Sequence, residues 1–359
     1  MNKDKKRSGA SVALQIFVGV ASAVVAIAIG PSLLGLIFLS FLVAMYLQII
    51  IHEAGHLIFG IFTGYKFSSF RIGSFMWQKE QDKVRLKRLS IAGTGGQCLM
   101  SPPELVDGKI PFVLYNFGGV ILNTAAFVLF FVSSVLCKGI PYLAFFFLIV
   151  GVVGLMYALL NGIPLRLSTI NNDGYNTISI GKNDEAQRAF WIQLSVQSQI
   201  AKGHRLKDLS DEWLFIPSDD GMNNSIIATI GALQCNQLMD MHAFEEAYQL
   251  MNTLINMDSA MVGLHRYLLN CDRIYCELIG ENRSDRLEYI FDTQQKKFMN
   301  SMKNSPTVLR TEYAYTVIVE KDIKKAEKIE LIFEKMAQKY PYQSDIESER
   351  ELIQIVKNI

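Results

Sequence analysis

Two histidines and a glutamate lie within five residues of one another, in His52-Glu53-Ala54-Gly55-His56. On a helix, residues four apart share one face, so His52 and His56 can present imidazole nitrogens to a single cation. Glu53 lies beside them. This is the H-E-x-x-H pattern, in which two His bind Zn²⁺ and the Glu serves as a general base for hydrolysis. The residues therefore predict zinc-dependent hydrolytic chemistry.

The motif lies at the end of a charge-free apolar run. Between Arg7 and Glu53 the chain has no Asp, Glu, Lys or Arg, and no His other than His52. The plainer interpretation is a helix with a few polar residues facing the interior of a bundle. Ionisable groups at membrane depth are costly, however, and usually mark functional sites. The position therefore favours a metal site within a membrane.

The composition indicates a membrane protein with more than one region. Half of the residues are apolar, 19% are charged and the formal net charge is +1. A membrane span needs about 20 apolar residues, and residues 12–30, 32–51, 112–137 and 140–162 satisfy that condition. Residues 221–239 are also charge-free, but their Asn and Gln side chains make them too polar for lipid. We expect four membrane-spanning helices, and a soluble helix over 221–239.

Basic residues predict the orientation of these spans. The Lys- and Arg-rich stretch at residues 3–7 precedes the first span, which predicts a cytoplasmic N-terminus. The loop from 64 to 110 is rich in Lys and Arg, whereas the 138–141 turn has one Lys. With four spans the C-terminus is cytoplasmic too, in a multi-pass protein of the cell membrane. A signal peptide within residues 1–30 is the competing interpretation, but the apolar stretch is long for one.

A catalytic zinc site normally has three protein ligands and one water position, so H-E-x-x-H lacks one ligand. The five cysteines include no C-x-x-C pair, so we expect neither disulfides nor a cysteine zinc site. Asn161-Gly162-Ile163-Pro164 ends the fourth span, and Asp173-Gly174 follows. Pro164 interrupts a helix, and broken backbone at membrane depth is tolerated where it lines a cavity. Alone, Asp-Gly is a common turn, and Asn-x-x-Pro is a common helix end. Together with H-E-x-x-H, the two motifs favour a protease-like metal site.

At these residues the chain resembles the site-2 protease family of intramembrane zinc metalloproteases, peptidase family M50. The resemblance covers residues 32–200 and rests on H-E-x-x-H, on Asn-x-x-Pro followed by Asp-Gly, and on Gly118-Gly119-Val120-Ile121-Leu122-Asn123 between them. It implies that Asp173 is the third zinc ligand and that Asn161 lies close to the active site. Asn123 belongs to the motif of the middle helix, although Gly118 and Gly119 could equally serve close helix packing.

One departure from the family pattern concerns the third ligand. Asp173 lies nine residues beyond Pro164, farther than the commoner family spacing, and Asn172 precedes it where Leu is usual. Asp184 and Glu185 are the fallback ligands, but both read as solvated residues that open the next helix.

The loop between the second and third spans has strand-like alternation. Phe67–Trp77 and Val84–Ile91 flank Lys79-Glu80-Gln81-Asp82, which predicts a β-hairpin. The resemblance implies that such a loop lies near the active site and pairs with substrate; an edge strand can hold a peptide extended. The alternative is a hairpin that only packs on the helices. Gly93–Gly96 and Ser101–Pro103 are expected to form a flexible connection or lid.

From Asp184 onward the sequence changes to amphipathic helices with charged faces. Similar helices begin near Phe244, Asp285 and Lys324, a spacing near 40 residues, which favours tetratricopeptide-like repeats over a plain helical bundle without excluding the bundle. A repeat array offers a concave surface for a protein partner. The mixed Lys and Glu along 321–335 indicate a solvated face, so we expect no nucleic acid as a partner.

The sequence therefore predicts an all-α membrane protein. It has four transmembrane helices with a β-hairpin insertion on the cytoplasmic side, followed by a cytoplasmic α-helical domain, with a metalloprotease domain at 1–181 and the helical domain at 182–359. We expect an intramembrane zinc endopeptidase with one Zn²⁺, acting on membrane proteins or membrane-associated peptides in regulated proteolysis or peptide maturation, with Glu53 as general base and Asn161 as an oxyanion donor.

The alternative function is a non-catalytic zinc-binding membrane scaffold whose tail recruits a partner. A structural zinc site more often has four protein ligands, and the sequence offers no fourth nearby. A transporter is disfavoured, since no inverted repeat is evident among the spans.

Overall fold

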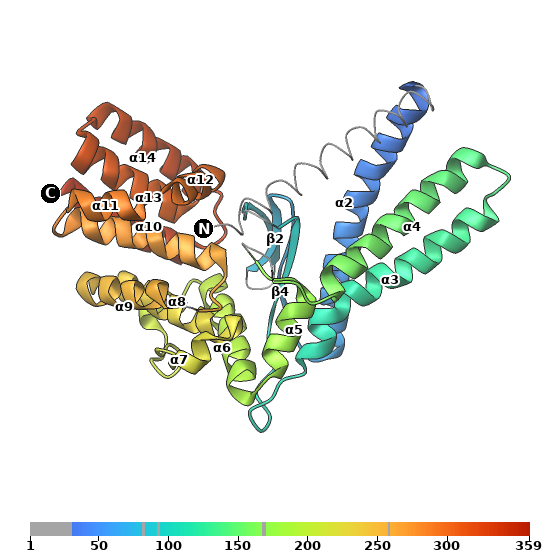
Figure 1. The fold of residues 1–359 in the computed structure, drawn as a ribbon, viewed down its shortest axis with the longest axis horizontal. Coiled ribbons are helices and arrows are strands. Elements are labelled where there is room, and N and C mark those ends of the chain that lie inside the picture. Colours follow the sequence, from blue (N-terminus) through green and yellow to red (C-terminus); the bar gives the residue numbers. More distant parts are fainter. Residues whose placement is uncertain (1–30, 81–82, 92–93, 167–169, 258) are drawn as a thin grey trace, which may run out of the picture. The chain divides into compact units, whose positions relative to one another are not determined.

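The computed structural model of the chain describes residues 31–80, 83–91, 94–166, 170–257 and 259–359. These residues are mostly helical and include one small antiparallel sheet (Figure 1). The predicted span at 12–30, and the competing signal peptide, lie outside the described residues.

Three of the described helices are long and apolar enough to cross a membrane: α2 (Pro31–Phe62), α3 (Phe112–Leu136) and α4 (Pro141–Gly162). They confirm the apolar helices of membrane length that the sequence predicts at 32–51, 112–137 and 140–162. Helix α2 continues past His56 and ends near Gly64, whose φ of +89° suits a residue without a Cβ. The H-E-x-x-H residues therefore lie inside a membrane-length helix.

Polar side chains between these apolar helices are paired. Gln48 on α2 donates to the carbonyl oxygen of Val150 on α4 over 2.9 Å, and Asn123 on α3 donates to the side-chain oxygen of Gln48 over 2.7 Å. Both amide side chains are fully buried. Such satisfied amides can link helices in a lipid environment.

Four strands form the sheet: β1 (Lys66–Ile72), β2 (Phe75–Glu80), β3 (Lys83–Arg88) and β4 (Gly96–Ser101), in the order β3-β2-β1-β4. The hairpin expected around Lys79–Asp82 is β2 and β3. The prediction of one strand over Phe67–Trp77 is wrong, because the chain reverses at Gly73, with a φ of +58°, and makes two strands. The predicted flexible connection is wrong at Gly96 and at Ser101, because these residues are the two ends of β4, which pairs with β1 as an edge strand.

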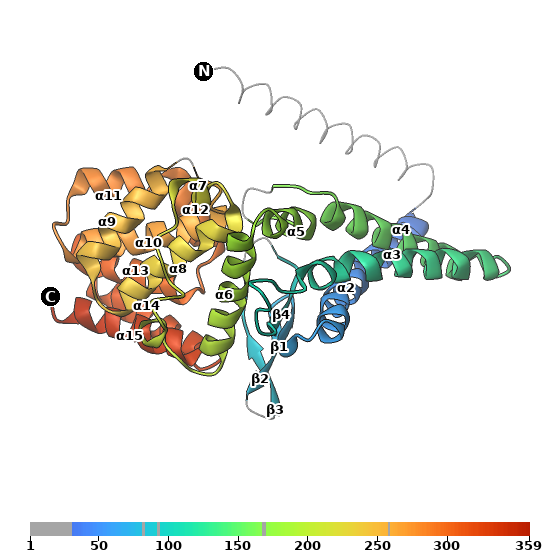
Figure 2. The same ribbon diagram turned by 90° about the horizontal axis from the view of Figure 1, so that it is seen from below.

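The sheet shares a core with the first helices of the tail. Met76, Cys98 and Met100 from the strands lie in one buried cluster with residues of α6 (Asp184–Ala201) and with Tyr342. Figure 2 shows α6 beside β4, and the Ser101 and Ser198 hydroxyl oxygens of these two elements are 2.7 Å apart.

The helices after α4 follow one another with short connections. The predicted soluble helix at 221–239 is α8, and the helices expected near Phe244, Asp285 and Lys324 are α9, α11 and α14. The elements are α5 (Asp173–Gly181), α6, η1 (Leu206–Asp208), α7 (Asp219–Met222), α8 (Ser225–Asp240), α9 (Phe244–Asn256), α10 (Gly263–Ile279), α11 (Ser284–Ile290), α12 (Thr293–Ser301), α13 (Pro306–Tyr315), the π-helical turn η2 (Thr316–Glu320), α14 (Ile323–Ala337) and α15 (Gln343–Lys357).

Contacts divide the described chain into two compact units. One holds the described residues up to Gln48 together with Asn123–Tyr157, and the other holds Ile49–Leu122 together with Ala158–Ile359. The H-E-x-x-H residues, Asp173, the sheet and the tail all belong to the second unit. The boundary at 181/182 stays a prediction.

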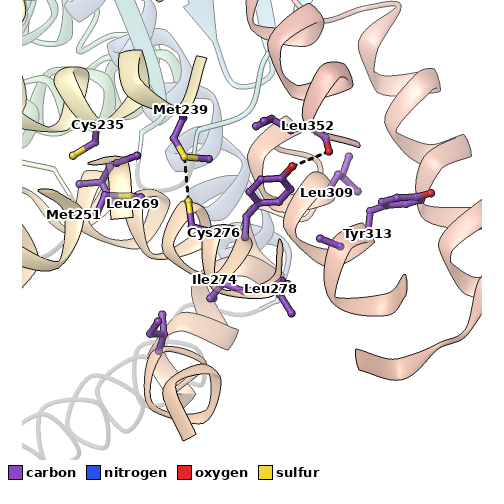
Figure 3. Close-up of a cluster of buried hydrophobic side chains, with 14 of the residues drawn as sticks. Cys235, Met239, Met251, Leu269, Ile274, Cys276, Leu278, Leu309, Tyr313 and Leu352 are labelled. Carbon is purple, nitrogen blue, oxygen red and sulfur yellow. Dashed lines mark hydrogen bonds between the residues drawn. The ribbon is translucent and has the colours of Figure 1, made fainter. Parts of the chain in front are cut away.

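The core of the tail combines packed apolar side chains with a buried ion-pair network. The Cys276 sulfur lies 3.4 Å from the Met239 sulfur, in a buried cluster that also contains Leu309 and Leu352 (Figure 3). All five cysteines are free, as expected. Arg310 is 1% exposed and pairs with Asp272 and, over 2.8 Å, with Glu349. Its guanidinium also lies 4.5 Å from the centre of the Tyr275 ring.

Replacing Arg310 should destabilise the tail far more than replacing an exposed arginine. Arg310→Met leaves two buried carboxylates without their cationic partner and should lower the free energy of unfolding by about 3–5 kcal/mol. The control Arg350→Met breaks an exposed pair with Glu334, which is worth about 0–1 kcal/mol. Thermal or denaturant unfolding of the full chain in detergent measures both.

The loss in Arg310→Met should also depend on pH. Burial raises the pKa of Asp272 to about 6 although Arg310 opposes the shift. Without Arg310 the pKa of Asp272 rises further. At a pH above this pKa the buried carboxyl group is ionised and destabilises the fold, and at a pH below it the group is neutral. The destabilisation should therefore shrink between pH 8 and pH 5. A loss of equal size at both pH values would contradict the assignment.

Candidate metal centre

The structure brings His52, His56 and Asp173 together. The Nε2 atoms of His52 and His56 are 3.2 Å apart, and the Asp173 Oδ2 atom lies 3.0 Å from the first and 3.5 Å from the second. Asp173 opens α5, after the break that follows α4. The fallback candidates Asp184 and Glu185 are exposed at the start of α6.

These three atoms have the spacing that a tetrahedral zinc ion requires. Ligand atoms about 2.0–2.1 Å from Zn²⁺ lie about 3.3 Å from one another in a tetrahedron. The three observed separations, 3.0, 3.2 and 3.5 Å, lie around that value. Two imidazole nitrogens and one carboxylate oxygen also form the donor set of a catalytic site with one position left for water. The residues present therefore fit zinc.

Helix α3 orients the His56 ring through its backbone. The Nδ1–H of His56 donates to the carbonyl oxygen of Tyr115 over 2.8 Å, which leaves the lone pair of a neutral ring on Nε2, facing His52. Tyr115 in turn donates its hydroxyl to the carbonyl oxygen of Cys98 on β4 over 2.9 Å, and its ring stacks on Tyr65. Sequence reasoning missed this contact, because any residue type supplies a carbonyl oxygen.

Glycines let α2 and α3 approach closely at the site. A Cβ at Gly118 would lie 2.4 Å from the Gly55 carbonyl oxygen, and a Cβ at Gly119 would lie 2.5 Å from Nδ1 of His52. Gly118 therefore serves close packing of the two helices. Gly119 leaves the space that the His52 ring occupies.

Strand β4 begins directly against the Glu53 carboxyl group. Glu53 is 7% exposed, and a Cβ at Gly96 would lie 2.6 Å from its Oε1 atom. Arg71, 1% exposed on β1, donates to the carbonyl oxygens of Gly73 (2.7 Å) and Gly96 (3.1 Å) and to the Thr94 hydroxyl. Burial lowers the pKa of Arg71, and the Glu53 charge opposes the shift. The buried arginine thus fixes the backbone that covers Glu53.

Asp173 is ionised in this setting. Burial would raise the pKa of its carboxyl group, but the adjoining His56 and His52 imidazoles hold it below its ordinary range. An ionised carboxylate is the form that binds a metal.

Asn161 lies at the end of α4 and is half-buried. Its backbone carbonyl oxygen would lie 3.1 Å from a Cβ at Gly174, so this end of α4 packs on the start of α5. The role expected for the Asn161 side chain stays a prediction.

The family model of "Peptidase family M50" matches residues 40–353. The match covers most of the sequence and extends well beyond residues 32–200, which carry the resemblance. The chain therefore belongs to peptidase family M50, the site-2 protease family. Members of this family are zinc metalloproteases of membranes. Searches of curated proteins and of solved structures found no match.

Filling the space beside His52 should weaken zinc binding. Gly119→Ala places a methyl group against the imidazole and must displace the ring or the helix, so we expect zinc affinity to fall by about tenfold or more, as for other groups that orient a ligand. Gly35→Ala is the matched control, because a Cβ at this α2 glycine would meet no atom of the described residues within 4 Å. Chelator competition on the purified full chain measures both affinities. Equal affinities would show that the ring is not confined by Gly119.

Proposed function

We propose that the chain is an intramembrane zinc endopeptidase that hydrolyses peptide bonds in or near the transmembrane segments of membrane proteins or membrane-associated peptides. The observation that carries the proposal is the meeting of His52, His56 and Asp173 beside Glu53, with both histidines and the glutamate inside a helix of membrane length.

In this proposal His52, His56 and Asp173 hold one Zn²⁺. When bound, zinc acts as a Lewis acid that activates water and polarises the scissile carbonyl. Glu53 is the proton carrier: it takes a proton from the attacking water and delivers it to the leaving amine. Asn161 is proposed as a hydrogen-bond donor to the developing oxyanion.

The position of the site suits hydrolysis at a membrane. The Asp173 side chain is 22% exposed, more than either histidine, so water reaches the cluster from the side of α5. Apolar side chains are exposed along the membrane-length helices, among them Phe38 (64%), Leu129 (62%) and Leu136 (77%), as expected for lipid contact. With the span at 12–30, we propose four spans in the cell membrane and both termini in the cytoplasm, on the basis of the flanking Lys and Arg residues.

Substrate is proposed to bind along the outer edge of β4, which pairs with no other strand among the described residues. This strand pairs with β1 on one side, and its first residue contacts Glu53. An extended peptide added to this edge would pass the proposed general base with its backbone accessible. The carbonyl oxygens of Gly96 and Cys98 already accept bonds from Arg71 and Tyr115, but each carbonyl has a second lone pair.

The tail supplies a second surface for substrate or for a protein partner. A cavity of about 850 Å³ lies between the sheet and the tail helices and is lined by Gln97 of β4, Gln197 of α6, Asn236 of α8 and Asp345 of α15. The amide side chains of Gln97, Gln197 and Asn236 can bind peptide backbone. Helices from successive parts of the tail line this cavity.

Glu53→Gln tests the mechanism. The amide keeps the shape of the side chain but cannot accept the proton, so cleavage should fall by about 10²–10⁴-fold while zinc content stays that of the native chain. Glu185→Gln, at the exposed start of α6, should cleave normally. Comparing membrane-protein fragments from cells with native chain and with Glu53→Gln would also identify the substrate. Undiminished cleavage by Glu53→Gln would contradict the role of Glu53 as general base. A native chain that cleaves nothing, in cells whose phenotype is unchanged by Glu53→Gln, would leave the scaffold as the better interpretation.

Photo-crosslinking tests the proposed substrate edge. In a Glu53→Gln background, which keeps the substrate intact, a crosslinking residue at Gln97 on β4 should capture the substrate found by that comparison. The same residue at Leu86, exposed on the opposite edge strand β3, should not. Capture at Leu86 alone would place the substrate on the wrong edge for the proposal.

A further inference from the structure

The third zinc ligand follows an interruption of the backbone. Helix α4 ends at Gly162, and Pro164 prevents its continuation. The last carbonyl groups of any helix have no partner within that helix and need another donor. Asp173, nine residues after Pro164, must nevertheless place its carboxylate beside His52 and His56. Something must fix the start of α5 relative to the end of α4.

The Asn172 side chain makes that connection. Its Nδ2 atom donates to the carbonyl oxygens of Leu160 and Ile163, each over 2.6 Å. Its Oδ1 atom accepts from the backbone N–H of Leu165 and from that of Tyr175, each over 3.0 Å. Asn172 is 5% exposed, and these bonds use the two donors and the acceptor lone pairs of a carboxamide.

Only a carboxamide of this length matches the four partners. The end of α4 offers two acceptors, and Leu165 and Tyr175 offer two donors. An apolar side chain such as leucine would satisfy none of the four. Serine could cap α5 but is too short to reach the α4 carbonyl groups.

The backbone around Asn172 leaves little room for displacement. A Cβ at Gly174 would lie 2.3 Å from the Gly162 carbonyl oxygen, so the first turn of α5 is in direct contact with the end of α4. Asp173 lies between this contact and the Asn172 amide. Its position therefore depends on both.

We propose that Asn172 is a positioning residue for Asp173: by tying the start of α5 to the end of α4, it holds the carboxylate beside the two histidines across the connection that follows Pro164. The inference rests on the proposed zinc site.

Asn172→Leu removes all four bonds and should lower zinc affinity by about 10–100-fold, the usual effect of removing a group that orients a metal ligand. The matched control is Asn183→Leu. Asn183 caps α6 in the same way, through a 2.8 Å bond from the Ala186 N–H to its side-chain oxygen, but it is exposed. Both variants lose a helix cap, so the loss of the cap itself is matched. Chelator competition and the Tm of zinc-free protein, on the full chain in detergent, separate affinity from folding.

Asn172→Ser separates the cap on α5 from the tie to α4. Because serine restores only the cap, this variant should bind zinc as weakly as Asn172→Leu. Added zinc should restore the cleavage rate of both variants to the plateau of the native chain. The zinc concentration that gives half of this plateau should rise by the same factor as the zinc affinity falls. A misfolded chain would not recover in this way.

Three results would overturn the inference. Zinc affinity in Asn172→Leu within about twofold of that in Asn183→Leu would show that Asn172 does not position the ligand. Native affinity in Asn172→Ser would show that the cap alone is sufficient. A native chain that binds no zinc would overturn the proposed function together with this inference, whereas the first two results leave the zinc site intact.

Discussion

The meeting of two imidazoles and two carboxylates inside a bundle of apolar helices is the constraint on which the rest of the structure depends. His52, Glu53 and His56 are each less than a tenth exposed, and Asp173 is partly buried against both histidines. Ionisable groups in such surroundings are costly unless opposite charges or a metal compensate them. In the proposed function, a zinc ion held by the two imidazoles and one carboxylate would supply that compensation, and Arg71 places a further positive charge near Glu53.

Backbone geometry is what brings these groups together from distant parts of the chain. Gly55 and Gly118 let two helices touch, Gly119 makes room for the His52 ring, and Gly96 lets an edge strand lie on the Glu53 carboxyl. Each position admits no side chain without displacement of a neighbour. The site therefore depends on close backbone approach as much as on the side chains that act in it, and Asn172 makes a comparable contribution where the helix is interrupted.

The sequence predicts the parts of this arrangement that have local signals. Apolar length reveals α2, α3 and α4, and the four-residue spacing of His52 and His56 reveals the metal-binding face. Asp173 could be predicted by resemblance alone, and the structure places it beside them. Strand β4 escaped prediction because its glycine-rich start looks like a turn and its conformation depends on pairing with β1. The contact from His56 to the Tyr115 carbonyl has no signature in residue types.

The central claim is that His52, His56 and Asp173 share one zinc ion, and X-ray absorption at the zinc edge tests it most directly. On the purified full chain we expect one zinc per chain, a shell of nitrogen and oxygen ligands at about 2.0–2.1 Å, and the scattering pattern of two imidazoles. Asp173→Ala should lose this zinc or change its shell, whereas Asp184→Ala should keep both. Sulfur ligands in the native spectrum, or an unchanged spectrum and zinc content in Asp173→Ala, would contradict the account.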